Sequence, residues 1–95
     1  MIEKKKSNII IEKLKPYHPK MIGIFGSYAR NENHQQSDLD ILVTFEPTVN
    51  LLEIIGLEIE LSEILGVKVD LVTQKALNPQ IEKYVMKDLK IIFND

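Results

Sequence analysis

The order of apolar and polar segments between residues 24 and 45 constrains the fold of this chain most. These residues read IFGSYARNENHQQSDLDILVTF. A first apolar run stops at Gly26 and Ser27, and ten residues after Ser27 a second run opens with Asp38 and Asp40. Short apolar runs bounded by turn residues are typical of strands. The segment therefore predicts two strands, with a glycine–serine turn ending the first and a pair of carboxylates starting the second.

The rest of the sequence predicts helices and further strands around this pair. We expect helices over residues 2–14 and 50–65 and from residue 79 onward, strands over 20–25, 38–45 and 67–73, and an edge strand or a tail over 89–93. The first strand has apolar residues on both faces, which indicates a central position in the sheet. The fold class is α/β (α+β): a small mixed β-sheet with helices packed on it, in one domain over residues 1–95.

Periodicity also predicts which side chains of the later helices are buried. In the helix over 50–65 the expected buried face is Ile54, Leu57, Leu61, Ile64 and Leu65. In the last helix, which Asn78 and Pro79 would begin, it is Ile81, Tyr84 and Val85.

Composition limits the classes of function. The chain has 95 residues and a net charge of −2, so non-specific electrostatic binding of DNA or RNA is not expected. It has no cysteine and two histidines, which excludes disulfides and argues against a zinc site. A reducing cytoplasm is compatible with this composition. The apolar run near the N-terminus is too short for a membrane span, and no membrane partner is expected.

The two aspartates point to the same side of their strand. Side chains at i and i+2 share a face, so Asp38 and Asp40 project together with α-carbons about 6.5–7 Å apart. Leu39 and Ile41 point the other way, into a core. Paired carboxylates repel each other unless a cation lies between them, and Mg²⁺ prefers oxygen ligands. The alternative is a solvated strand entry without a ligand.

The glycine–serine turn suits a negatively charged ligand. Gly26 has no Cβ, so another group can approach its backbone closely, and Ser27 adds a hydroxyl donor. Ser27 would also cap a short helix over residues 28–30, and an ordinary cap is the alternative interpretation. If the two strands are neighbours, the turn faces the carboxylates across a small gap. This layout could hold a nucleoside triphosphate with its Mg²⁺.

A third carboxylate extends the pair. Asp70 alternates with Val69 and Leu71 in VKVDLVT, so it shares the opposite face of the strand with Lys68. An unpaired carboxylate in an apolar strand is unfavourable. Three carboxylates on adjacent strands can serve two metal ions. Lys68 could contact phosphate, although a solvated lysine is the favoured interpretation.

These residues resemble a known family. GSYARNENHQQSDLD is similar to the signature of the DNA polymerase beta-like nucleotidyltransferase superfamily, which is G-S, ten residues, then D-x-D. The flanking IFGSYAR and SDLDILV also resemble the minimal nucleotidyltransferases of bacteria and archaea. One departure is Asn31, where these proteins usually have glycine. Asn tolerates a left-handed backbone, so we expect the turn to survive.

The resemblance implies transfer of AMP from ATP. Asp38 and Asp40 would bind two Mg²⁺ ions, and Asp70 would bind the ion next to the acceptor and help to deprotonate its hydroxyl. Gly26 and Ser27 would hold the β- and γ-phosphates. For Arg30, a contact with the phosphates and a surface ion pair are equally open. Tyr28 and Tyr84 could stack on adenine, although packing or partial exposure is favoured for both.

The resemblance also implies a partner. Minimal nucleotidyltransferases are commonly paired with a HEPN-domain toxin, which the antitoxin silences, sometimes by adenylylating a tyrosine on it. We expect a HEPN toxin as acceptor here, because a chain of 95 residues leaves little room for an acceptor domain. One alternative is a binding module that neutralises its partner by covering it. Another is a small-molecule nucleotidyltransferase completed by homo-oligomerisation.

Overall fold

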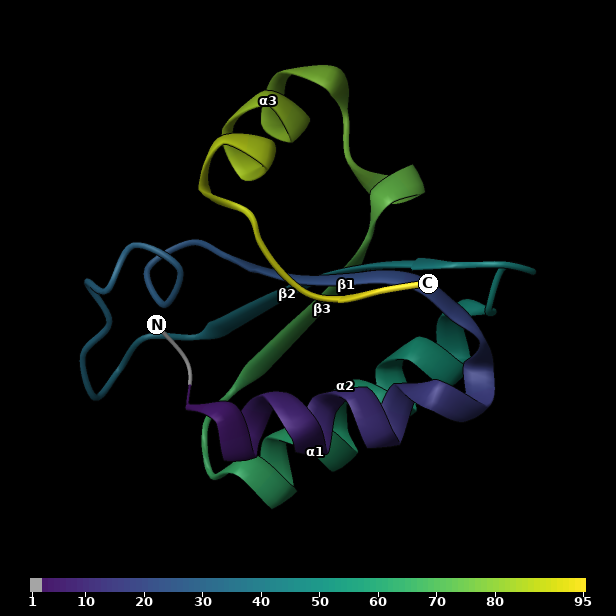
Figure 1. Cartoon of the computed structure of the whole chain (residues 1–95), viewed down its shortest axis with the longest axis horizontal. Helices are drawn as coiled ribbons and strands as arrows, with labels where there is room; N and C mark the ends of the chain where they lie inside the picture. The colour runs from purple at the N-terminus through teal and green to yellow at the C-terminus, as the bar shows by residue number, and fades with distance from the viewer. Residues whose placement is uncertain (1–2) are drawn as a thin grey trace.

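The computed structural model describes residues 3–95 and places helices on both faces of a four-stranded sheet (Figure 1). The elements are α1 (Lys4–Leu14), η1 (Lys15–Tyr17), β1 (Pro19–Phe25), β2 (Leu39–Phe45), α2 (Leu51–Leu65), β3 (Val69–Thr73), η2 (Gln74–Ala76), α3 (Pro79–Asp88) and β4 (Lys90–Asn94). The strand order is β3-β2-β1-β4. β1 is antiparallel to β2 and to β4, whereas β2 and β3 are parallel, so the sheet is mixed as predicted.

Most predicted elements are confirmed. The first strand is central, since β1 lies between β2 and β4. Residues 89–93, for which the sequence allows an edge strand or a tail, contribute to edge strand β4. The start of the first helix was predicted at residue 2, which lies outside the described residues. Within residues 3–95, no helix is both long and apolar enough to cross a membrane.

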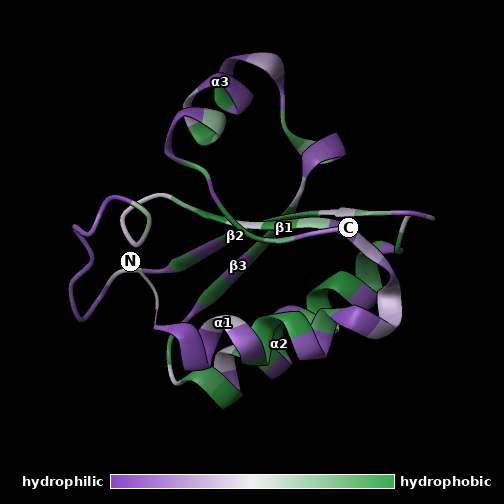
Figure 2. Cartoon of the chain, viewed as in Figure 1, coloured by the Kyte–Doolittle hydropathy of each residue, from purple (hydrophilic) through white to green (hydrophobic). Residues whose placement is uncertain are grey.

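One face of the sheet packs against α1 and α2. Leu39, Ile41 and Val43 of β2 are fully buried on this face, and Leu61 of α2 is fully buried with them in the core cluster. Figure 2 shows apolar residues along the strands and along α2. Burying one such side chain completely stabilises the fold by about 1.5–3 kcal/mol.

Helix α2 has well-defined ends. Asn50 accepts a hydrogen bond from the backbone N–H of Glu53 at 2.9 Å, and Gly66 ends the helix with φ of 69°. Both features are standard caps. The predicted buried face is confirmed except at Ile64, which is 47% exposed. Ile64 lies at the edge of the stripe, where the neighbouring Leu65 takes the buried position.

Helix α3 lies on the other face of the sheet, above β1 in Figure 1. A Cβ added at Gly23 would lie 2.5 Å from Leu89 Cδ1, so Leu89 packs directly over the backbone of this glycine. Of the expected face only Val85 is buried. The prediction is wrong for Ile81, which is 50% exposed, and for Tyr84, which is 74% exposed. The reason is that α3 meets the sheet along one narrow stripe, which leaves its flank uncovered.

Candidate active site

The glycine–serine turn follows β1 without forming a helix. Hydrogen bonds run from the Arg30 N–H to the Gly26 carbonyl at 3.2 Å and from the Glu32 N–H to the Ser27 carbonyl at 2.9 Å. The predicted short helix over residues 28–30 is therefore wrong, and these residues form turns. Two left-handed residues bend the chain here: Gly26 has φ of 73° and Asn31 has φ of 58°. The expected survival of the turn with Asn31 is confirmed, because Asn accepts this conformation at little strain.

The sheet brings the turn and the carboxylates together. Asp40 pairs with Phe25 across the antiparallel ladder and with Asp70 across the parallel one. Gly26, the residue after Phe25, lies so close to Asp40 that an added Cβ would collide with its Oδ2 atom. Paired strands are about 4.8 Å apart. The predicted neighbourhood of Gly26, Asp40 and Asp70 is therefore present.

Asp40 is the electrostatically strained member of the site. Partial burial raises the pKa of Asp40 to about 6, and the charge of Asp70, a hydrogen bond between the two side chains and the charge of Asp38 add to this shift. Arg30 acts in the opposite direction. Asp40 therefore keeps its proton to a higher pH than an ordinary carboxyl does, because burial and the neighbouring carboxylates disfavour its charged form.

Asp38 lies just before β2 and has a different neighbour. Its Oδ2 is 3.9 Å from Lys68 Nζ, and the two side chains are 40% and 72% exposed. An exposed pair at this distance contributes little to stability. Lys68 is thus largely solvated, which is the interpretation that the sequence favours. A contact of Lys68 with phosphate stays a prediction.

The three carboxylates supply the right donor atoms for Mg²⁺ but are not arranged around one point. Within residues 3–95, no three Asp, Glu or His side chains are arranged so that they could hold a metal ion as they stand. The reason is visible in the contacts: Asp40 and Asp70 face each other, whereas Asp38 lies toward Lys68. The donor chemistry nevertheless fits, because hard oxygen ligands suit Mg²⁺ and a cation would offset the repulsion that the neighbouring carboxylates exert on Asp40.

Arg30 takes part in two ion pairs. Its Nε lies 2.9 Å from Glu32 Oε1, and its Nη1 lies 2.5 Å from Asp88 Oδ2 at the end of α3. The structure thus contains the surface ion pair, and binding of phosphate by Arg30 stays a prediction. No sequence pattern indicates Asp88 as a neighbour of the turn, because its place there depends on how α3 packs across the sheet.

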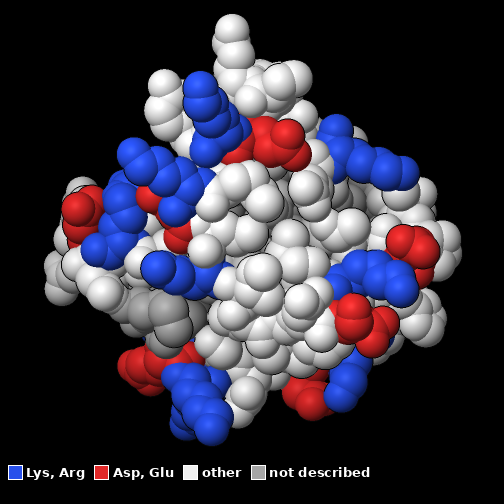
Figure 3. All heavy atoms as spheres, turned by 45° about the horizontal axis from the view of Figure 1, so that its top comes forward, with Lys and Arg blue, Asp and Glu red and all other residues white. Residues whose placement is uncertain are grey.

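Charge is mixed on this side of the molecule. Figure 3 turns the α3 side toward the viewer and shows basic and acidic groups around the rim of a largely uncharged middle. Substrate binding would therefore depend on individual side chains near the turn rather than on a broad field of one sign.

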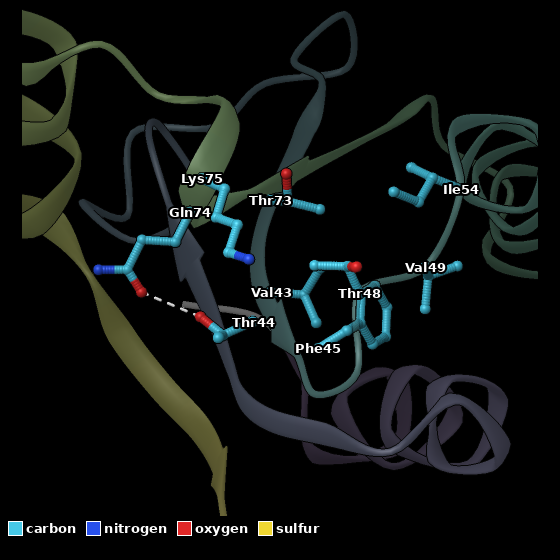
Figure 4. Close-up of a pocket in the computed structure, with 9 residues that line it drawn as sticks. All are labelled: Val43, Thr44, Phe45, Thr48, Val49, Ile54, Thr73, Gln74 and Lys75. Atoms are coloured by element: carbon cyan, nitrogen blue, oxygen red, sulfur yellow. Dashed lines mark hydrogen bonds between the residues drawn. The ribbon is translucent and has the colours of Figure 1, made fainter.

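A separate pocket lies at the other end of the parallel strands. It is lined by Val43, Thr44, Phe45, Thr48, Val49, Ile54, Thr73, Gln74 and Lys75. Figure 4 shows these side chains and the hydrogen bond, 2.9 Å long, from Thr44 Oγ1 to Gln74 Oε1. The pocket includes none of the predicted site residues. The carboxylates lie at the start of β2 and β3, whereas this pocket lies where the two strands end.

Comparison with known proteins places the chain in a family. The family model described as "Nucleotidyltransferase domain" matches residues 4–92. The chain belongs to the nucleotidyltransferase domain family. It has the nucleotidyltransferase activity that defines this family.

Relatives of this nucleotidyltransferase carry related names. A protein of Methanocaldococcus jannaschii, whose curated name marks it as a candidate protein adenylyltransferase, is 45% identical over 93% of this chain and 88% of its own length. The protein adenylyltransferase MntA of Thermococcus cleftensis is 47% identical over 72% of this chain and 69% of its own length. A crystal structure described as a toxin–antitoxin with AMP-PNP contains a chain that is 30% identical, with a TM-score of 0.84 over 94% of this chain and 73% of that one.

Proposed function

We propose that this nucleotidyltransferase transfers AMP from ATP to a tyrosine hydroxyl of a partner HEPN toxin and so acts as an antitoxin. One observation carries the proposal. The Asp40–Asp70 pair abuts the backbone of Gly26, so carboxylates and a glycine–serine turn form one site. The names of the relatives support AMP as the transferred group and a protein as the acceptor. The toxin–antitoxin structure with AMP-PNP supports ATP as the donor and a toxin as the partner.

The glycine–serine turn would bind the phosphates of ATP, and the carboxylates would bind its Mg²⁺. The left-handed backbone at Gly26 allows phosphate oxygens to approach the main chain, because no Cβ stands in the way. The Ser27 hydroxyl can donate to the same oxygens, and Arg30 can contribute a guanidinium from the next turn. These residues would hold the β- and γ-phosphates and orient the α-phosphorus toward the acceptor.

Asp38, Asp40 and Asp70 would hold two Mg²⁺ ions. When bound, Mg²⁺ neutralises charge on the phosphates and lowers the pKa of a bound hydroxyl. Asp70 lies on β3, farther from the turn than Asp40, so we assign the acceptor side of the site to Asp70. The Asp70 carboxylate would orient the acceptor hydroxyl and receive its proton.

The reaction is a balanced substitution at phosphorus. The tyrosine oxygen forms a bond to the α-phosphorus, and the bond from that phosphorus to the bridging oxygen of the leaving group breaks. Pyrophosphate departs, and the hydroxyl proton passes to a carboxylate. Most of the rate enhancement would come from alignment and charge stabilisation.

Intact-mass spectrometry of the partner tests the proposal. A candidate HEPN toxin is incubated with the parent protein, ATP and Mg²⁺. Each transferred AMP adds about 329 Da, which is fixed by the chemistry of the covalent adduct. Asp38→Asn should abolish the mass shift and weaken ATP binding, whereas Asp70→Asn should abolish the shift and reduce ATP binding less.

A matched variant and a second outcome complete the test. Glu63→Gln changes an exposed carboxylate on α2 and should transfer AMP like the parent. If the parent and Asp38→Asn both neutralise the toxin without any mass change, the protein acts by covering its partner, and the enzymatic proposal is wrong.

A further inference from the structure

The exposed flank of α3 carries an unexplained aromatic side chain. Tyr84 is 74% exposed and Ile81 is 50% exposed, although a helix packed on a sheet usually turns such residues inward. Both residues share a side of α3 with Asp88, since positions 81, 84 and 88 follow the i, i+3, i+7 spacing of one helical face.

Two contacts of α3 determine which way the face with Ile81 and Tyr84 is oriented. Asp88 pairs with Arg30 of the glycine–serine turn, so the flank with Ile81 and Tyr84 is turned toward the turn. Glu82, on the opposite flank, lies 3.5 Å from the Gln74 amide nitrogen in η2, at the far end of β3. The helix therefore presents its Tyr84 flank to the active site and its Glu82 flank away from it.

The sheet surface beside this flank belongs to the active site. Asp40 pairs with Phe25, the last residue before the turn, and the charge of Arg30 reaches Asp40. Tyr84 lies one helical turn before Asp88, about 6 Å along the axis of α3. A nucleotide with its phosphates at Gly26 would thus have an exposed aromatic and an aliphatic side chain within reach of its base.

We propose that Tyr84, flanked by Ile81, is the stacking platform for the base of the donor nucleotide. This inference rests on the proposed function, because it assumes that the phosphates lie at the turn. An exposed phenol ring can lie flat against a purine, and Ile81 can cover the edge of that purine. Any base has a π-face, so the platform favours purines by their larger area and discriminates only weakly between adenine and guanine. The Arg30–Asp88 pair holds the platform at a fixed place relative to the phosphate-binding turn.

Calorimetry with two Mg²⁺-bound ligands tests this assignment. ATP has a base, whereas inorganic tripolyphosphate has only the phosphates. Tyr84→Ala should weaken ATP binding about fivefold or more, in line with the contribution of one stacked base, and leave tripolyphosphate binding unchanged. Tyr84→Phe keeps the ring and should bind ATP within about twofold of the parent.

The control variant is Met86→Ala, which removes a side chain that is 45% exposed elsewhere on α3. It should bind both ligands like the parent. The assignment is overturned if Tyr84→Ala binds ATP as tightly as the parent, or if it loses affinity for ATP and tripolyphosphate equally. Unchanged ATP affinity with a raised KM for the toxin would assign this flank to the acceptor instead. A parent protein that binds neither ligand would overturn the proposed function itself, a result distinct from all of these.

Discussion

The two faces of the sheet use the same strands for different purposes. On one face, Leu39, Ile41 and Val43 of β2 are fully buried against α1 and α2. On the other face, Asp40 and its partner Asp70 are only partly buried, and the pKa of Asp40 is raised to about 6. Because successive side chains of a strand point to opposite faces, neighbouring residues of β2 take these two different roles. The buried face therefore fixes the backbone positions that force two carboxylates together on the other face.

The helices that pack on the two faces of the sheet differ in the same way. α2 packs its fully buried Leu61 into the core, whereas α3 covers its face with little more than Val85 and Leu89. A sparse cover leaves the carboxylates and the flank of α3 accessible to a ligand. We therefore expect substitutions on the α2 side of the sheet to alter stability and substitutions on the α3 side to alter activity.

The largest expected effect is on the carboxylate face. Asp40→Asn should reduce AMP transfer about a thousandfold, equivalent to about 4 kcal/mol, because it removes a charge that would hold Mg²⁺ between two strands. The rate of transfer is measured by intact mass of the toxin. The native fold should persist, as shown by an unchanged far-ultraviolet circular dichroism spectrum. Transfer within tenfold of the parent would contradict a central role for Asp40.

The second expected effect is on the buried face. Leu61→Ala should lower the free energy of unfolding by about 3 kcal/mol, because it leaves a cavity beneath the sheet. Urea denaturation measures the loss. Ile59→Ala on the same helix is the matched control, since Ile59 is 57% exposed and its loss should change stability by at most about 0.5 kcal/mol. Equal losses in the two variants would show that α2 does not bury its Leu61 face.

The buried face is also the part that the sequence predicts best. Alternation in SDLDILV places Leu39 and Ile41 inward and Asp38 and Asp40 outward, and the structure agrees. The spacing from Ser27 to Asp38 likewise anticipates the meeting of the turn and the carboxylates. These features depend on local periodicity and on one short connection between paired strands.

The α3 face is predicted less well, for a physical reason. Helical periodicity identifies Ile81, Tyr84 and Val85 as one apolar stripe, but it does not say how much sheet lies beneath that stripe. The Arg30–Asp88 pair joins residues 58 positions apart, and no local pattern encodes such a contact. The roles of Gly26, Ser27, Arg30 and the three aspartates stay predictions until variants are measured.

The third expected effect concerns the junction between turn and carboxylates. Gly26→Ala should lower the free energy of unfolding by about 2 kcal/mol, because alanine is strained at φ of 73° and its Cβ would meet Asp40. Gly66→Ala has the same backbone strain, with φ of 69°, but its Cβ would meet no atom of residues 3–95 within 4 Å. This substitution should therefore lower the free energy of unfolding by only about 1 kcal/mol. Gly56→Ala lies in α2 with open space around it and should stabilise the protein by about 0.5 kcal/mol. Urea denaturation of the three variants measures this order, and equal losses at Gly26 and Gly66 would deny the contact with Asp40.

The smallest expected effect is a dependence of stability on pH that comes from Asp40. Its pKa is about 6 in the folded protein, against an ordinary value of 3.8, so the folded state holds a proton that the unfolded state has lost between these values. Stability should therefore fall as pH rises from about 4 to about 6, and the penalty should persist above that range. Because Asp40 is only partly buried, solvent screening reduces the effect to about 1 kcal/mol.

Comparison with a neutral side chain isolates this contribution. Without divalent metal, Asp40→Asn should match the parent near pH 4 and be about 1 kcal/mol more stable by pH 7, because the amide carries no charge to be desolvated or repelled by Asp70. Urea denaturation at unit steps of pH measures the difference between the two proteins. A difference that stays constant from pH 4 to pH 8 would mean that Asp40 ionises normally. The carboxylate face would then be no more strained than an ordinary protein surface.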